Sequence, residues 1–181
     1  MSVSVAIDID GVLANQIDKF EQIAKRYGIT DTEWRKSYNG IYQVYDKDNV
    51  ILADRIFKDH LEEFLLDTKP MKGARKAFKK FIDNKHFDVY IVTSRHKENG
   101  DLTERWLTEN GFVGHIDTLY MKDKTKAPCQ VIVDDHVKHI KSYSSKARMG
   151  ILVDAPYNQD SQVGYRVKSV KKAYEYLLQF T

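Results

Sequence analysis

Residues 5–12, Val5-Ala6-Ile7-Asp8-Ile9-Asp10-Gly11-Val12, join an apolar run to two carboxylates and a glycine. Near-continuous apolar runs are typical of strands that are buried on both faces of a parallel sheet. Side chains two positions apart point to the same side of a strand, so Asp8 and Asp10 can face one site. Gly11 permits a sharp turn after them. Taken alone, the segment fits a catalytic or metal-binding site and an ordinary turn about equally well.

Further apolar runs predict strands at residues 3–9, 89–93, 118–121, 131–133 and 151–153. Helical periodicity lies between them, at residues 73–85, 101–110, 136–146 and 167–180. Strands that alternate with helices in this way predict an α/β fold, a doubly wound parallel sheet covered by helices.

One interval is too long for this alternation. Asp8 and Thr93 lie 85 positions apart, whereas one strand-helix-strand unit needs about 30 residues. The excess contains helical patterns at residues 17–27 and 50–66. We therefore expect a core of residues 1–15 and 70–181 and a helical cap, residues 16–69. Open α/β sheets bind ligands at the carboxyl ends of their strands, so the cap is expected to act as a lid.

Polar side chains follow the second predicted strand as Thr93-Ser94-Arg95. Hydroxyl groups and strand-end amides can hold phosphate oxygens, and a guanidinium group can add a charged fork. The same three residues also fit an ordinary polar loop, so this signal is weak by itself.

A lysine cluster and an acidic pair complete the candidate site. At most one of Lys122, Lys124 and Lys126 is expected to offset negative charge at the site, since a solvated loop accounts for most lysines. Asp134 and Asp135 end an apolar strand, where their desolvation is costly unless a metal or hydrogen-bond donors compensate. Either acid could instead cap the following helix.

The order of these elements resembles that of the haloacid dehalogenase (HAD) superfamily, and more closely that of the 5′(3′)-deoxyribonucleotidases. The matching segments are residues 8–14 (Asp-x-Asp-Gly-Val-Leu-Ala), Thr93-Ser94, Asp123-Lys124-Thr125 and Asp134-Asp135. The spacing of ten residues between the lysine and the acidic pair selects Lys124 over its neighbours.

The resemblance implies a magnesium-dependent phosphomonoester hydrolase. Asp8 would attack phosphorus and form an aspartyl-phosphate. Asp10 would protonate the leaving oxygen and later activate water. Mg²⁺ would bind the Asp8 side chain, the Asp10 backbone carbonyl and an acid of the last motif, with Asp135 as first choice and Asp134 as second.

The resemblance also implies the groups that hold the substrate. The phosphate ligands would be Thr93, Ser94 and Lys124, with Arg95 as a further substrate-binding residue. The expected substrate is a small phosphorylated molecule, a deoxy- or ribonucleoside monophosphate. Tyr42 is a candidate for stacking on the base, although a buried cap aromatic fits equally well.

Other functions stay open at this point. A polynucleotide 3′-phosphatase would need a strongly basic groove, and the formal net charge of +3 argues against one. A sugar phosphatase is a further alternative within the superfamily. A receiver-like phosphoacceptor module would use similar residues, but it would place its acid pair at the first strand.

Composition gives the remaining expectations. Hydrophobic residues make up 42% and charged residues 30% of the chain, as in globular proteins. No apolar run approaches the length of a membrane span. The single cysteine, Cys129, excludes an internal disulfide and fits a reducing compartment. With no basic leader before the first strand, a cytoplasmic location is expected. The sequence does not predict the oligomeric state.

Overall fold

The computed structural model describes residues 2–114, 116–146 and 148–181. Within these residues, six parallel strands form one sheet in the order β3-β2-β1-β4-β5-β6. The strands are β1 (Val3–Ile7), β2 (Phe87–Thr93), β3 (Thr118–Tyr120), β4 (Val131–Asp134), β5 (Met149–Val153) and β6 (Tyr165–Val167). This order, which reverses between β1 and β4, is that of a doubly wound sheet and confirms the predicted fold class.

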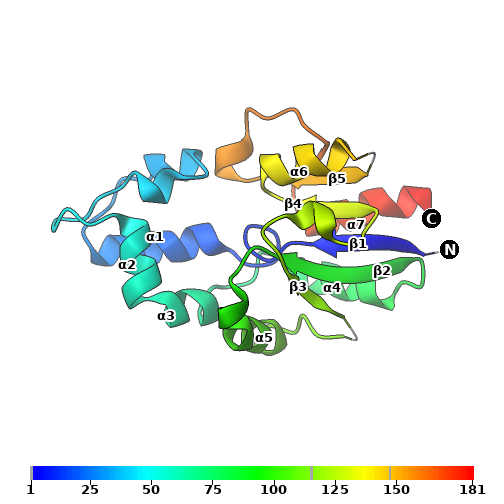
Figure 1. Cartoon of the computed structure of the whole chain (residues 1–181), viewed down its shortest axis with the longest axis horizontal. Coiled ribbons are helices and arrows are strands. Elements are labelled where there is room, and N and C mark those ends of the chain that lie inside the picture. The colour runs from blue at the N-terminus through cyan, green and yellow to red at the C-terminus, as the bar shows by residue number, and fades with distance from the viewer. Residues whose placement is uncertain (1, 115, 147) are drawn as a thin grey trace.

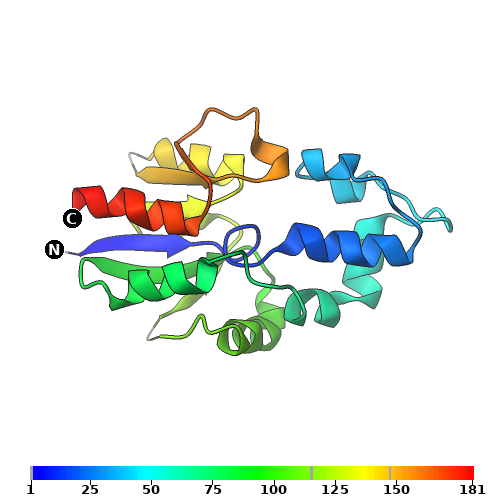
Figure 2. The same cartoon turned by 180° about the vertical axis from the view of Figure 1, so that it is seen from behind.

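Helices cover both faces of the sheet (Figures 1 and 2). The core helices are α4 (Ala74–Asp83), α5 (Gly100–Glu109), α6 (Val137–Ser144) and α7 (Val170–Leu177). Val5 and Ile7 pack into one apolar cluster with α4, α5 and α7, whereas Ala6 packs into another cluster with α6. The alternation along β1 therefore buries both faces of this central strand, as the continuous apolar run predicts.

Residues 16–69, which follow β1 in the chain, lie beyond the carboxyl ends of the strands, on the side opposite the two termini (Figure 1). It contains α1 (Gln16–Arg26), the 3₁₀ turns η1 (Glu33–Lys36) and η2 (Gly40–Tyr42), α2 (Leu52–Asp59) and α3 (Leu61–Leu66). An apolar cluster of its own, which includes Phe20, Ile23, Leu52 and Ile56, holds these elements together. We keep the division into a core and a cap of residues 16–69 as a proposal.

Three details differ from the sequence-based expectation. The helix expected over residues 50–66 is two helices, because His60 leaves the helical conformation with φ −134°. The first strand ends at Ile7 rather than Ile9, so the two aspartates lie on the loop that follows it. The edge strand β6 was not predicted, since it is short and lacks an apolar run.

The described part of the chain contains no helix that is both long and apolar enough to cross a membrane.

Candidate active site

The candidate site lies where the strand order reverses, between β1 and β4. Asp8 directly follows β1, and its backbone amide donates to the carbonyl of Val133 at 3.0 Å. Asp134 ends β4 and Asp135 follows it. In open α/β sheets this reversal point is the usual place for a ligand, because the loops on either side diverge there.

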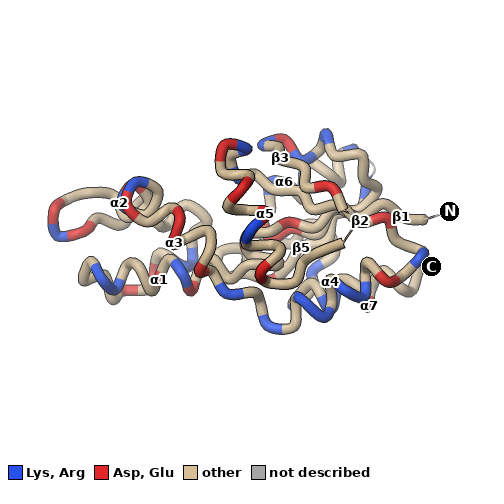
Figure 3. Tube along the Cα trace, turned by 90° about the horizontal axis from the view of Figure 1, so that it is seen from below, with Lys and Arg blue, Asp and Glu red and all other residues tan. Residues whose placement is uncertain are grey.

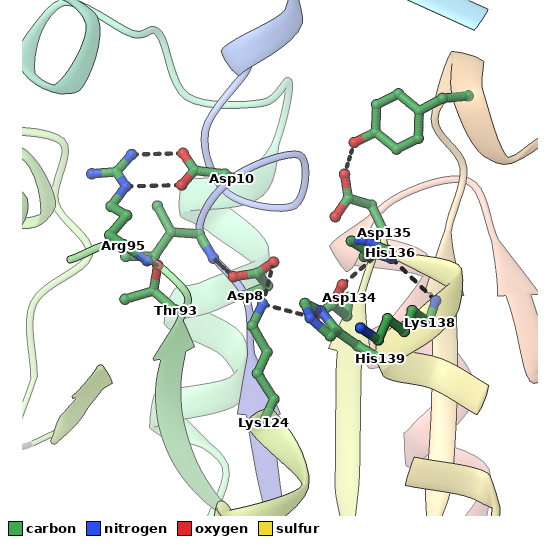
Figure 4. A network of polar contacts seen from close by, with 12 residues as sticks. Asp8, Asp10, Thr93, Arg95, Lys124, Asp134, Asp135, His136, Lys138 and His139 are labelled. Atoms are coloured by element: carbon green, nitrogen blue, oxygen red, sulfur yellow. Dashed lines mark hydrogen bonds and ion pairs between the residues drawn. The ribbon is translucent and has the colours of Figure 1, made fainter. Parts of the chain in front are cut away.

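Lys124 forms ion pairs with Asp8, which follows β1, and with Asp134, which ends β4 (Figure 4). Its Nζ lies 2.6 Å from Oδ2 of Asp8 and 2.8 Å from Oδ2 of Asp134, and only 2% of its side chain is exposed. Lys122 and Lys126 are exposed. The structure therefore brings the predicted lysine, and neither of its neighbours, to the nucleophile candidate.

A short 3₁₀ turn, η4 (Lys124–Lys126), positions this lysine. The carboxylate of Asp123 caps the turn by accepting from the Thr125 amide at 3.1 Å and from the Thr125 hydroxyl at 2.6 Å. Local side-chain caps of this kind are strongly favoured for aspartate. The Asp123-Lys124-Thr125 sequence thus forms a capped turn that holds the Lys124 side chain in place.

The buried charges shift one another's pKa values. Burial raises the pKa of Asp8 to about 7, against the opposing charge of Lys124 and with a contribution from Asp134. Burial, together with the charge of Asp134, raises the pKa of Asp135 well above its ordinary value. Burial by itself would lower the pKa of Lys124, but the negative charges of Asp134 and Asp8 outweigh burial and raise it. Burial by itself would raise the pKa of Asp134, but Lys124 and His139 outweigh burial and lower it.

The three buried carboxylates fit a divalent cation. Asp8, Asp134 and Asp135 each offer one oxygen, and these oxygens lie within 4.8 Å of one another. Hard carboxylate oxygens are the ligands that Mg²⁺ prefers. The raised pKa values of Asp8 and Asp135 mean that their shared negative charge lacks full compensation, which a cation would supply.

The two acids of the last motif differ in what they already bind. Oδ1 of Asp134 accepts from the His136 amide at 2.7 Å, and its Oδ2 accepts from Lys124 and lies 2.9 Å from Nδ1 of His139. Asp135, by contrast, accepts from the hydroxyl of Tyr157. The fuller set of partners on Asp134 makes Asp135 the better candidate for a direct metal ligand.

Gly11 has a steric role that the sequence shows only as a turn. Its φ is 81°, a conformation that L-residues with a side chain rarely adopt. A Cβ at this position would also overlap the carboxyl group of Asp135. The glycine therefore lets the loop after β1 approach the acidic pair.

Asp10 and Arg95 form a two-pronged ion pair, drawn in Figure 4. Nε of Arg95 lies 2.9 Å from Oδ2 of Asp10, and Nη2 lies 2.7 Å from Oδ1. The sequence suggested Arg95 as a substrate ligand, but the structure places its fork on a protein carboxylate. Thr93 is fully buried and its Oγ1 accepts from the Arg95 amide at 3.2 Å, whereas Ser94 is exposed.

A cavity of about 660 Å³ opens above these residues. Its core side includes Asp8, Asp10, Ser94, Arg95, Lys124 and Asp135. Its cap side is mostly apolar and aromatic and includes Phe20, Tyr38, Tyr42, Phe57, Leu61, Phe64 and Leu65. The structure thus brings most of the predicted site residues, and the predicted Tyr42, to one cavity. Thr93 and Asp134 do not line it and lie fully buried.

Sequence reasoning missed the contact between cap and core. The ring of Tyr38, from the cap, lies 3.8 Å from the ring of His136 and 5.4 Å from that of Tyr157. Burial, with the positive charge of His139, lowers the pKa of His136 to about 4. A neutral imidazole suits this aromatic contact. No sequence signal links these residues, since they meet only in the folded chain.

Comparisons with known proteins found a matching family and structures of similar fold. Residues 1–180 match the model of the family described as 5′ nucleotidase, deoxy (pyrimidine), cytosolic type C protein. A relative from Bacillus cereus, named "Putative nucleotidase", is 38% identical over 47 residues, and this match covers 25% of this chain and 25% of that protein.

Several solved structures share the fold over nearly the whole chain. One is a haloacid dehalogenase-like hydrolase from Streptococcus pneumoniae, with TM-score 0.66, 9% identity, and coverage of 97% of this chain and 98% of that one. A HAD hydrolase from Bacillus subtilis bound to magnesium has TM-score 0.64, 14% identity, and coverage of 98% and 99%. A HAD family hydrolase from Deinococcus radiodurans with bound phosphate and sodium has TM-score 0.62, 14% identity, and coverage of 98% and 96%. At these identities the likeness concerns the fold.

Proposed function

Since the chain belongs to the family of 5′ nucleotidase, deoxy (pyrimidine), cytosolic type C proteins, and is thus a phosphoric monoester hydrolase with a HAD fold, we propose that it dephosphorylates deoxy- or ribonucleoside monophosphates through Asp8. The observation that carries the proposal is the buried Lys124–Asp8 pair at the base of a cavity whose other wall is aromatic. Family membership also sets aside the receiver-like phosphoacceptor module.

The proposed reaction has two displacements at phosphorus. In the first, an Asp8 oxygen forms a bond to phosphorus while the ester bond to the leaving nucleoside breaks, and Asp10 donates a proton to the leaving oxygen. In the second, Asp10 takes a proton from water, which attacks phosphorus and releases phosphate and free Asp8. Lys124 favours the charged form of Asp8, against the effect of burial, and offsets the negative charge of the phosphoryl oxygens.

Asp8, Asp135 and the backbone carbonyl of Asp10 would hold Mg²⁺ in this proposal. When bound, the ion supplies positive charge that neutralises the phosphoryl oxygens. The carboxylate cluster of Asp8, Asp134 and Asp135 supports the assignment.

Metal binding predicts a pH-dependent stabilisation. Without a cation, the raised pKa values of Asp8 (about 7) and Asp135 make the folded state bind more protons than the unfolded chain above the ordinary carboxyl pKa. The stability of the metal-free protein should therefore fall as the pH rises toward 7. Mg²⁺ competes with these protons, so it should raise the melting temperature clearly at about pH 8 and little at about pH 5.

Thermal melts in MgCl₂ and in EDTA at both pH values check this expectation. Asp135→Asn should remove most of the magnesium-dependent shift at the higher pH. A shift of equal size at both pH values, or one that survives in Asp135→Asn, would contradict the metal assignment.

The cavity favours a nucleotide over the other substrates. Phe20, Tyr42 and Phe57 give its cap wall aromatic faces on which a base can stack, a contact that a sugar phosphate lacks. Among the described lining residues the lysine and arginine side chains are Lys124 and Arg95, and both are paired with aspartates. Basic residues gather instead along α4 and α7 (Figure 3), which contribute nothing to the lining, so a polynucleotide groove has little support.

Phosphate release from a panel of substrates tests the nucleotide assignment. The panel contains deoxy- and ribonucleoside 5′- and 3′-monophosphates, 3′-phosphorylated oligonucleotides and sugar phosphates. We expect the highest kcat/KM for a nucleoside monophosphate. A preference for sugar phosphates would overturn the nucleotidase proposal and leave the phosphatase assignment intact.

Tyr42→Ala should raise the KM for the preferred nucleotide about tenfold, since base–aromatic stacking contributes about 1–3 kcal/mol. The KM for a sugar phosphate should not change. Tyr45→Ala is the matched control, because Tyr45 is an exposed tyrosine of the same segment that does not line the cavity. Equal effects of the two variants would remove Tyr42 from the substrate site.

We also propose a cytoplasmic location. The family description is cytosolic, and the single cysteine, Cys129, is free and buried. Both observations are of the kind expected in a reducing compartment.

A further inference from the structure

We propose that Arg95 is a positioning residue, which holds the Asp10 carboxylate at the cavity and is itself anchored to the end of the cap through Trp106. The inference rests on the proposed role of Asp10 as proton donor to the leaving group, and the ion pair with Arg95 shows the carboxylate that remains once that proton has been given up. It replaces the expectation that Arg95 binds the substrate phosphate.

The ion pair fixes the direction of the Asp10 side chain. Both oxygens of Asp10 are engaged, at 2.9 and 2.7 Å, by the planar Nε–Nη2 edge of Arg95. A guanidinium fork constrains the orientation of a carboxylate, which a single point charge cannot do. Asp10 is 23% exposed and Arg95 only 5%, so the arginine supports a carboxylate that remains open to the cavity.

Arg95 has little capacity left for a phosphate. Its Nε and Nη2 are occupied, and its Nη1 is buried without a hydrogen-bond acceptor among the described residues. An atom that solvent cannot reach is poorly placed to meet a substrate in an open cavity. Lys124 is the cation paired with the proposed nucleophile Asp8, whereas Arg95 is paired with Asp10.

Packing holds Arg95 in this orientation. Its Cζ lies 5.7 Å from the ring centroid of Trp106, within the range of a cation–π contact, which partly compensates the unpaired Nη1. Its backbone amide donates to Oγ1 of Thr93. The guanidinium group is thus fixed by an aromatic face and by the end of β2.

Trp106 is tied in turn to the cap. This tryptophan is fully buried, and its Nε1 donates to the carbonyl of Thr68 at 2.6 Å. Thr68 follows α3, and its hydroxyl donates back to the carbonyl of Phe64, which lines the cavity. A continuous set of contacts therefore connects the last cap helix to Asp10.

Leaving-group dependence separates a positioning role from phosphate binding. A nucleoside leaves as a strongly basic alkoxide and needs a proton, whereas p-nitrophenolate leaves without one. The parameter kcat/KM reports the steps up to formation of the aspartyl-phosphate, so it excludes the hydrolysis step that the two substrates share. A misplaced Asp10 should therefore affect kcat/KM for the nucleotide and not for p-nitrophenyl phosphate.

We expect Arg95→Gln to lower kcat/KM for a nucleoside monophosphate by roughly 100-fold. The value for p-nitrophenyl phosphate and the inhibition constant of inorganic phosphate should stay near those of the wild type. Arg95→Lys, which keeps a buried cation, should show the same selective loss with smaller size, and so should Trp106→Phe. Arg105→Gln, an exposed arginine on α5, is the matched control.

A double-mutant cycle completes the test. In an Asp10→Asn background, Arg95→Gln should cause no further loss, because the two residues act as one unit. Equal losses with both substrates together with weaker inhibition by phosphate would make Arg95 a phosphate ligand and overturn the inference. Equal losses without a change in phosphate inhibition, in Arg95→Lys as well, would indicate a merely structural role and also overturn it. A wild-type protein that releases no phosphate from either substrate would instead refute the proposed function.

Discussion

Replacing Asp8 with asparagine is expected to abolish phosphate release while leaving the fold intact. An amide is not a nucleophile towards phosphorus, and removal of a catalytic nucleophile typically costs on the order of 10⁴-fold or more in kcat. The fold should tolerate the change, because Lys124 keeps its ion pair with Asp134 and the raised pKa of Asp8 indicates that its charge is unfavourable beside Asp134 and Asp135. Asp8→Asn should therefore melt at or above the wild-type temperature when magnesium is absent.

The comparison needs phosphate release and a thermal melt on the same preparation. Asp83→Asn is the control, since Asp83 lies on α4 in an exposed pair with Lys79, and such pairs contribute little. Normal turnover by Asp8→Asn would remove Asp8 as the nucleophile. Inactivity with a collapsed melt would mean that Asp8 is needed for the structure instead.

Lys124→Met is expected to damage both stability and activity. Lys124 is the cation that touches both Asp8 and Asp134, and all three side chains are at least 92% buried. Removing one partner of a buried ion pair typically costs about 3–5 kcal/mol, because it leaves an uncompensated charge. Activity should fall as well, since the cation also offsets charge on the phosphoryl group.

Urea denaturation in EDTA and phosphate release in magnesium measure the two effects. The destabilisation should shrink at low pH, where the stranded carboxylates take up protons. Lys126→Met is the control, since Lys126 belongs to the same turn but is exposed. If both variants were equally stable and active, the central electrostatic role of Lys124 would be wrong.

The core of the fold could be predicted because its strands are buried on both faces. Central strands such as β1 and β4 appear in the sequence as uninterrupted apolar runs. The edge strand β6 does not, since Tyr165 and Arg166 are exposed and only Val167 is half-buried. The break at His60 was also hidden, because helical periodicity continues across it and its contact with Tyr27 is tertiary.

The residues of the candidate site likewise fall into some that the sequence predicts and some that it does not. Asp8 and the acidic pair could be expected to lie together because they follow strands whose carboxyl ends meet in a doubly wound sheet. Lys124 was selected over its neighbours by the ten-residue spacing that the family resemblance implies. The partner of Arg95 could not, since it depends on the burial of that side chain against Trp106. The cap residues that face the cavity are likewise set by packing between segments and leave no spacing rule in the sequence.

The most direct test of the account is to look for phosphate on Asp8 itself. The Asp10→Asn variant should form the aspartyl-phosphate but hydrolyse it slowly, because it lacks the base that activates water. After acid quenching of this variant with a nucleoside monophosphate and magnesium, peptide mass spectrometry should find a phosphoryl group on Asp8, and none in Asp8→Asn. Wild-type turnover of the nucleotide combined with no phosphoryl group on Asp8, or with one on another residue, would contradict the mechanism.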